Sequence, residues 1–186
     1  MISIISLWIP IVLSSVIVFI ASSIMHMLLK YHRSDFKKLP NEPALLETLR
    51  KDSIPPGVYF FPYMAGPSEM KSPEVIEKFK KGPVGILTVR PSGAPSMGKN
   101  LVQWFLFSIV IGIFVAYLAG RFLPVGTHYL TVFRFAGTMA FMAYGVGQLV
   151  NSIWHGVPWS TTIKAVIDGL VYALLTAGTF GWLWPR

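Results

Sequence analysis

The sequence predicts an all-α membrane protein, with four transmembrane helices and a small mixed α/β cytoplasmic cap between the first two. Of its 186 residues, 53% are hydrophobic and only 13% are charged, against about a quarter charged in ordinary soluble domains. The charges are also segregated, because residues 30–100 hold twelve of the sixteen Lys and Arg and seven of the eight acids. The nearly uncharged remainder is long enough to cross a bilayer several times.

The apolar stretches divide the chain into three parts. Residues 1–29 are expected to form a first span that is retained, because the apolar run is too long for a signal peptide and no basic residue precedes it. Residues 30–98 form a basic hydrophilic segment, and residues 99–186 hold the other three spans. The apolar runs of this last part lie at residues 101–120, 131–151 and 161–184.

Orientation follows from the positive charges, because Lys and Arg beside spans favour the cytoplasm. The first span ends in the basic cluster Lys30, His32, Arg33, Lys37 and Lys38. We therefore expect a multi-pass protein with the hydrophilic segment in the cytoplasm and both termini on the outer side. The aromatic residues fit this orientation: Trp8, Tyr117, Tyr129, Trp182 and Trp184 fall at the outer interface, and Trp104, Trp154 and Trp159 at the inner one.

The hydrophilic segment contains signals for short regular elements. Asn41 and Ser72 are typical helix starts, each closely followed by a proline. Residues 57–63 and 84–89 are typical of short strands bounded by Pro and Gly. These elements are too small for a large core, so we expect a cap that packs against the membrane helices or a partner. A loosely ordered linker is the alternative.

Small residues recur every fourth position in two of the spans. Such stripes let helices approach closely. We therefore predict tight packing between the second and fourth spans. The stripe residues are Gly112, Ala116, Gly120, Gly169, Ala173, Ala177 and Gly181.

A polar cluster is predicted at the inner ends of the spans. Lys164 and Asp168 are one helical turn apart and can form an ion pair within the fourth span. By depth, their neighbours should be His26, Gln148 and Asn151. Intramembrane ionisable residues are candidates for function. This cluster could relay protons, bind a lipid headgroup or ligate a cofactor, and its alternative role is to fix helix register.

Several kinds of site are not expected. The chain has no cysteine, which excludes disulfides, iron–sulfur clusters and thiolate zinc sites. The string GAPSMGKN at residues 93–100 resembles a P-loop but lacks the hydroxyl residue that holds magnesium, and a membrane span follows it. His26 and His155 lie too near the membrane boundary to favour haem. We expect no metal, no cofactor, no catalytic residue and no nucleic-acid partner.

Three stretches carry a resemblance to other proteins. Their strings are SSIMHMLLKYHRSDFKKLPNEPALLETLR (22–50), SPEVIEKFKKGP (72–83) and STTIKAVIDGLVYALLTAGTFGWLWP (160–185). With them the chain resembles a family of uncharacterised bacterial four-span membrane proteins. The resemblance implies the same four-span plan and a bacterial cytoplasmic membrane, and it implies no activity and no site residues.

The leading functional hypothesis is a non-catalytic accessory or scaffold subunit of a larger bacterial membrane complex, for example a respiratory or photosynthetic one. It depends on the scarcity of catalytic groups and on the small-residue stripes, which suit assembly. The first alternative is a small transporter or channel that uses the polar face of the fourth span. The second is a membrane enzyme or cofactor carrier. The expected partners are the bilayer, other membrane subunits, and anionic lipid headgroups beside the basic segment.

Overall fold

The computed structural model describes residues 2–186, which form two compact units. The helical unit comprises the chain up to Phe36 together with residues 96–186, and the inserted unit comprises residues 37–95. Residues 30–36 therefore belong with the apolar helices and not with the hydrophilic segment to which the sequence assigned them.

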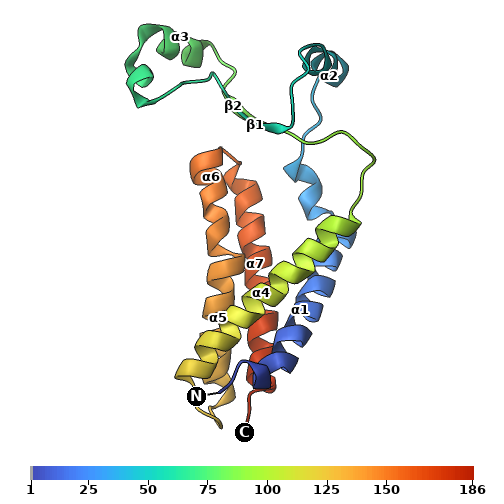
Figure 1. Cartoon of the computed structure of the whole chain (residues 1–186), viewed down its shortest axis with the longest axis vertical. Helices are drawn as coiled ribbons and strands as arrows, with labels where there is room; N and C mark the ends of the chain where they lie inside the picture. The colour runs from blue at the N-terminus through green and yellow to red at the C-terminus, as the bar shows by residue number, and fades with distance from the viewer. Residues whose placement is uncertain (1) are drawn as a thin grey trace. The chain divides into compact units, whose positions relative to one another are not determined.

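The helical unit is built from long helices that lie side by side (Figure 1). Helix α7 packs against α5 and α1, and α4 packs against α1 and α5. Figure 1 places both termini of this unit at the same end of the bundle. Its helices are α1 (Trp8–Ser23), α4 (Gly98–Phe122), α5 (Tyr129–Tyr144), α6 (Leu149–His155) and α7 (Trp159–Trp182), with short helical turns η1 (Ile5–Leu7), η2 (Ile24–Leu28), η3 (Lys30–Asp35) and η5 (Val146–Gln148).

Within residues 2–186, three helices are long and apolar enough to cross a membrane. They are Ile5–Leu28, Gly98–Phe122 and Trp159–Trp182, of 24, 25 and 24 residues. At about 1.5 Å per residue, each matches the roughly 30 Å hydrocarbon layer of a bilayer. The prediction of a mainly helical chain with apolar, span-length helices is confirmed to this extent.

The expected span at residues 131–151 is an interrupted helix. Helix α5 ends at Tyr144, the turn η5 follows Gly145, and α6 continues to His155. The interruption lies where α5 meets α7 most closely: a Cβ added to Gly169 would lie 2.5 Å from the Cα of Gly145. Two glycines so near one another bring backbone against backbone, and Gly145 and Gly147 also weaken the helix locally.

All seven stripe residues are buried, but they do not join the two helices that the sequence paired. A Cβ on Gly112 would lie 3.2 Å from the Ile11 side chain of α1. A Cβ added to Gly137 of α5 would lie 3.0 Å from the Cβ of Ala177 in α7. The α4 stripe therefore packs on α1 and the α7 stripe on α5, which corrects the expected pairing.

The inserted unit has the short elements that the sequence predicts. Helix α2 (Glu42–Lys51) and helix α3 (Pro73–Lys81) each carry a proline in their first turn, where the missing N–H costs nothing. Strands β1 (Gly57–Phe61) and β2 (Gly85–Val89) form an antiparallel pair, with Tyr59 opposite Leu87. A short turn, η4 (Pro67–Lys71), precedes α3.

Candidate functional site

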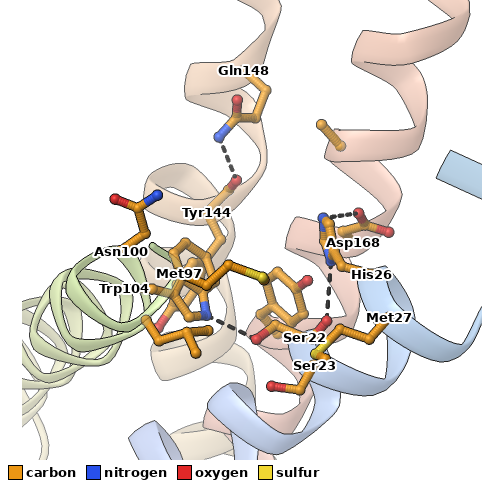
Figure 2. Close-up of a pocket in the computed structure, with 13 residues that line it drawn as sticks. Ser22, Ser23, His26, Met27, Met97, Asn100, Trp104, Tyr144, Gln148 and Asp168 are labelled. Atoms are coloured by element: carbon orange, nitrogen blue, oxygen red, sulfur yellow. Dashed lines mark hydrogen bonds and ion pairs between the residues drawn. The ribbon is translucent and has the colours of Figure 1, made fainter. Parts of the chain in front are cut away.

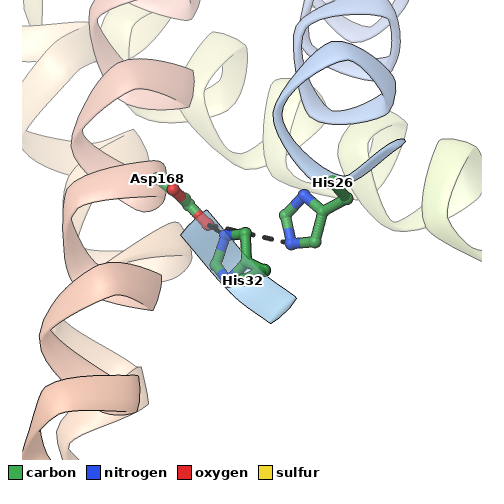
Figure 3. Close-up of side chains that lie close together, drawn as sticks. All are labelled: His26, His32 and Asp168. Atoms are coloured by element: carbon green, nitrogen blue, oxygen red, sulfur yellow. Dashed lines mark hydrogen bonds and ion pairs between the residues drawn. The ribbon is translucent and has the colours of Figure 1, made fainter. Parts of the chain in front are cut away.

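The candidate site lies where the first helix ends and the chain turns back against α7. The last turn of that helix, η2, carries His26. Leu29 is extended, with φ −79° and ψ 132°, and this bend sends the chain into η3, which carries Tyr31, His32 and Asp35. Helix α7 supplies Asp168 from the opposite side, as Figure 3 shows.

The side chains of His26, His32 and Asp168 lie close together. The Nε2 atom of His32 lies 2.8 Å from Oδ2 of Asp168, and Nε2 of His26 lies 3.7 Å from the same oxygen. The two imidazole rings are stacked, with centroids 4.4 Å apart and planes inclined by 12°. One donor atom from each of the three side chains lies within 4.8 Å of the other two. We call these three residues the His–His–Asp cluster.

The second nitrogen of each histidine is held by an oxygen acceptor. His26 Nδ1–H donates to the carbonyl of Ser22 at 3.1 Å, a contact drawn in Figure 2. His32 Nδ1–H donates to Oδ2 of Asp35 at 2.6 Å. With Nδ1 of each ring held by an oxygen acceptor, each ring directs its Nε2 toward Asp168. Contacts of this kind orient histidine ligands in metal sites.

Lys164 pairs with Asp35, and not with Asp168 as the helical spacing suggested. Its ammonium donates to Oδ1 of Asp35 at 2.8 Å, to the Tyr31 carbonyl at 2.8 Å and to the Ser34 hydroxyl at 2.7 Å. Burial raises the pKa of the Asp35 carboxyl, and bonds from Lys164 and His32 lower it by more, so that this pKa lies below its usual value. Asp35 is therefore a carboxylate fixed between a lysine and a histidine.

Tyr31 closes the other side of the cluster. Its hydroxyl donates to Oδ1 of Asp168, leaving Oδ2 to face the histidines. Burial, and then the hydrogen bond to the Asp168 carboxylate, raise the pKa of the Tyr31 hydroxyl. Tyr31 thus stays a neutral donor. The Asp168 side chain is only 4% exposed, and the Tyr31 hydroxyl fixes its Oδ1 atom.

A pocket of about 450 Å³ adjoins the cluster (Figure 2). Asp168 and His26 form part of its wall, and Trp104, Tyr144 and Tyr172 form an aromatic part. The indole N–H of Trp104 donates to the Ser22 hydroxyl at 2.8 Å. The pocket also includes Ser23, Met27, Met97, Asn100, Leu101, Gln148 and Ala165.

The structure brings together only some of the residues that were expected to cluster. His26 Nε2 lies 3.7 Å from Oδ2 of Asp168. Lys164 forms an ion pair with Asp35, which in turn bonds His32 beside Asp168. Gln148 lines the same pocket but donates to the Tyr144 carbonyl at 3.3 Å. Asn151 donates to Gln148 Oε1 at 3.1 Å. Gln148 and Asn151 therefore form a second polar group on η5 and α6.

Sequence reasoning missed His32, Asp35 and Tyr31 as site residues. His32 was interpreted as one of the basic residues that mark the membrane boundary. A signal was present, since His32 and Asp35 have the i, i+3 spacing of a helical turn directly after a span that already carries His26. That spacing places a carboxylate beside an imidazole.

Comparison with protein-family models, with curated proteins and with solved structures found no match to this chain. The chemistry of the site is therefore the basis for its function.

The His–His–Asp cluster has the donor set of a first-row transition-metal site. Imidazole nitrogen and carboxylate oxygen together suit Zn²⁺ and its neighbours, whereas Mg²⁺ and Ca²⁺ prefer oxygen alone. With metal–ligand bonds of about 2.0–2.2 Å, tetrahedral ligand atoms lie roughly 3.3–3.6 Å apart. The separations of 2.8 and 3.7 Å to Asp168 Oδ2 bracket that range. Because the two imidazole rings are stacked, one ring has to rotate for both nitrogens to reach the same ion.

Proposed function

We propose that this chain is a membrane-embedded protein that binds a divalent first-row transition metal, of which Zn²⁺ is the representative, through His26, His32 and Asp168. One observation carries the proposal: two imidazole nitrogens and one carboxylate oxygen lie within 4.8 Å of one another, and oxygen acceptors hold the other nitrogens of both rings. Of the three functions considered from the sequence, this is nearest to the cofactor carrier.

The metal would take the place of a proton. Nε2 of His32 approaches Asp168 Oδ2 at hydrogen-bond distance, and that contact needs a proton between the two atoms. An ion bound there replaces the proton, so binding should release it. Three protein ligands leave a fourth position for water or for a molecule in the adjoining pocket, as in catalytic zinc sites.

Metal titration of the purified full-length protein tests this proposal. The protein is prepared in detergent with a tag that contains no histidine, stripped with chelator and titrated with Co²⁺ by absorbance and with Zn²⁺ by calorimetry. We expect one equivalent to bind, and we expect Asp168→Asn and His26→Gln each to weaken binding by more than tenfold. His155→Gln is the matched control, because His155 lies on α6 outside the cluster. Equal affinity in all four proteins would contradict the proposal.

The proposed topology has four spans in a bacterial cytoplasmic membrane, with α5, η5 and α6 together as the third. Residues 129–155 contain this interrupted helix, and its three parts, α5, η5 and α6, all contact α7. Both termini would lie outside and the inserted unit inside, where its excess of Lys and Arg would face anionic headgroups. The charge segregation along the sequence supports this orientation.

A second candidate is the accessory subunit of a larger membrane complex. The observation that favours it is apolar surface on the inserted unit, where Val58 is 72% exposed, Tyr63 77% and Met70 59%. Because the small-residue stripes are used inside the chain, attachment would occur through this unit and not through the stripes. Recovery of a stable, metal-binding monomer from native membranes under mild detergent, with no other subunit, would count against it.

The transporter alternative has less support from the geometry. Beyond Tyr172, the hydroxyls of Thr176 and Thr179 donate to backbone carbonyls of α7 itself. The polar face of α7 therefore offers no series of free groups along its length, although flux in proteoliposomes would test the idea directly.

A further inference from the structure

We infer that the pocket beside the cluster binds the carbonyl-bearing head of a membrane amphiphile, with the hydroxyl of Tyr172 as its hydrogen-bond donor. The inference rests on the proposed membrane embedding and does not require the metal. Two chemical sources fit: a ring carbonyl of an isoprenoid quinone, or an ester carbonyl of a lipid acyl chain.

The first observation is an unsatisfied hydroxyl. Tyr172 is only 3% exposed and lines the pocket. Within residues 2–186, its hydroxyl oxygen is the buried side-chain polar atom with no hydrogen-bond partner. A buried phenol without a partner costs roughly 1–3 kcal/mol. A ligand that supplies an acceptor oxygen to this hydroxyl would remove that cost.

The second observation is the aromatic wall around that hydroxyl. The Trp104 ring lies 5.8 Å from Tyr172 and 6.2 Å from Tyr144, measured between centroids, and the two tyrosine rings are 5.7 Å apart. Rings packed in this way form a rigid apolar surface. Such a wall suits a flat head with few charges, and a volume of about 450 Å³ falls within the range of small-molecule pockets.

The third observation is the position of the opening. Met27 and Met97, which line the pocket, are 64% and 59% exposed. Met27 is in the last turn of the first helix and Met97 precedes the first turn of α4. His26 and Asn100, which also line the pocket, are exposed as well. An opening that combines flexible apolar and polar side chains at the ends of two span-length helices suits an amphiphile that enters from the interfacial layer of a bilayer.

Neutral carbonyl oxygen is the acceptor that this pocket selects. A charged acceptor would lie beside the Asp168 carboxylate, which repels it. Among the half-buried donors of the wall, Trp104 donates to Ser22 and Gln148 donates to the Tyr144 carbonyl, whereas the Asn100 amide is exposed. Tyr172 is therefore the buried donor that lacks a partner in the described part of the chain, and the ligand needs one matching oxygen on an otherwise apolar body.

Fluorescence quenching of Trp104 tests the inference in the chelator-treated full-length protein. One arm titrates a short-chain benzoquinone in detergent, and the other reconstitutes the protein with phosphatidylglycerol carrying brominated acyl chains. The signal of Trp104 is the difference between the wild type and Trp104→Phe, because the chain has five other tryptophans. Saturable quenching by the quinone identifies a ring carbonyl as the ligand, and saturable quenching by the brominated lipid identifies an acyl ester.

Two tyrosine variants form the matched pair. Tyr172→Phe should weaken binding roughly three- to tenfold, the value of one hydrogen bond. It should leave the unfolding midpoint of the ligand-free protein unchanged or higher, because the lost hydroxyl had no partner. Tyr129→Phe, the same change on α5 at a tyrosine outside the pocket, should leave affinity unchanged.

Quenching that only follows partition into the detergent or bilayer, or that is equal in wild type and Tyr172→Phe, would overturn the inference. So would the absence of quenching in both arms, which would leave a pocket that holds water. None of these outcomes affects the metal titration, which uses different ligands and different variants.

Discussion

Asp35 is the side chain that connects the charges of the site. One of its oxygens accepts from Lys164 at 2.8 Å and the other from His32 at 2.6 Å. Asp35 therefore fixes the orientation of the His32 imidazole, which faces Asp168, and it neutralises the charge of Lys164 in α7. In the proposed metal site its contribution would be indirect, because it positions His32 without being one of the three ligands.

Replacing Asp35 by Asn should weaken metal affinity by roughly 10- to 100-fold, the usual effect of losing a carboxylate behind a histidine ligand. The number of ions bound should stay at one, because His26, His32 and Asp168 remain. Calorimetric titration with Zn²⁺ measures both quantities. Loss of affinity no larger than that of Asp52→Asn, a change of the same kind on the inserted unit, would contradict this role.

The same substitution should change stability in a way that depends on pH. The pKa of Asp35 is lower in the folded protein than its usual 3.8, so its ionised form stabilises the fold above that value. This stabilisation is lost as the pH falls through the lowered pKa. Without metal, Asp35→Asn should cost roughly 2 kcal/mol near neutral pH, and the difference from wild type should shrink below about pH 4. Thermal unfolding in detergent across that range checks this, and a constant difference would argue against it.

At this scale the sequence identified His26, Lys164 and Asp168, because charged and polar side chains are rare within apolar helices and their depth can be estimated from helical rise. It did not identify His32, Tyr31 or Asp35. Their place depends on the bend at Leu29, which returns the chain to α7, and no local pattern encodes the direction of such a bend. The pairing of Lys164 with Asp35 instead of Asp168 depends on the same bend.

Helix α7 is the element on which both the packing and the site depend. Its small residues face α5, and its polar residues face η3 and the pocket. A close approach at Gly169 therefore helps to fix the position of Asp168, the neighbouring residue. Packing of this kind holds ligands more firmly than a loop would.

Gly169→Ala should destabilise the helical unit by about 1–3 kcal/mol, the usual cost of overpacking. The added Cβ would meet the backbone of Gly145 at 2.5 Å, where no flexible side chain can give way. Gly147→Ala is the control, because its Cβ would have nothing within 4 Å. The two unfolding midpoints in detergent compare these changes, and equal midpoints would show that α5 and α7 are not in close contact at Gly169.

The sequence predicted the apolar helices and the small stripes, but not the interruption near Gly145 or the partner of each stripe. Apolar runs are local and can be counted, whereas the choice of partner depends on how all the helices fit together. Gly145 and Gly147 were weak indications of a break, since glycine is tolerated in membrane helices.

For the whole molecule, the proposed orientation in a membrane would decide on which side the proposed metal site lies. The His–His–Asp cluster lies at the ends of the helices that lead to the inserted unit, because Leu28 and Gly98 flank the segment between them. If that segment is cytoplasmic, as the basic residues indicate, the metal would be taken from the cytoplasm.

Single-cysteine labelling tests this orientation, because the chain contains no cysteine of its own. Ser3→Cys should react in intact cells with a maleimide that does not cross the inner membrane, and Ser92→Cys, in the inserted unit, should react only after lysis. Both positions are exposed. The reverse pattern would place the cluster on the outer side.

X-ray absorption at the zinc edge, on Zn²⁺-loaded full-length protein purified without a histidine tag, tests the metal centre most directly. The site described above predicts two imidazole nitrogens and oxygen ligands at about 2.0–2.2 Å, with one imidazole lost in His26→Gln and the spectrum of His155→Gln unchanged. A spectrum with oxygen ligands alone, or one in which His26→Gln matches the wild type, would contradict it.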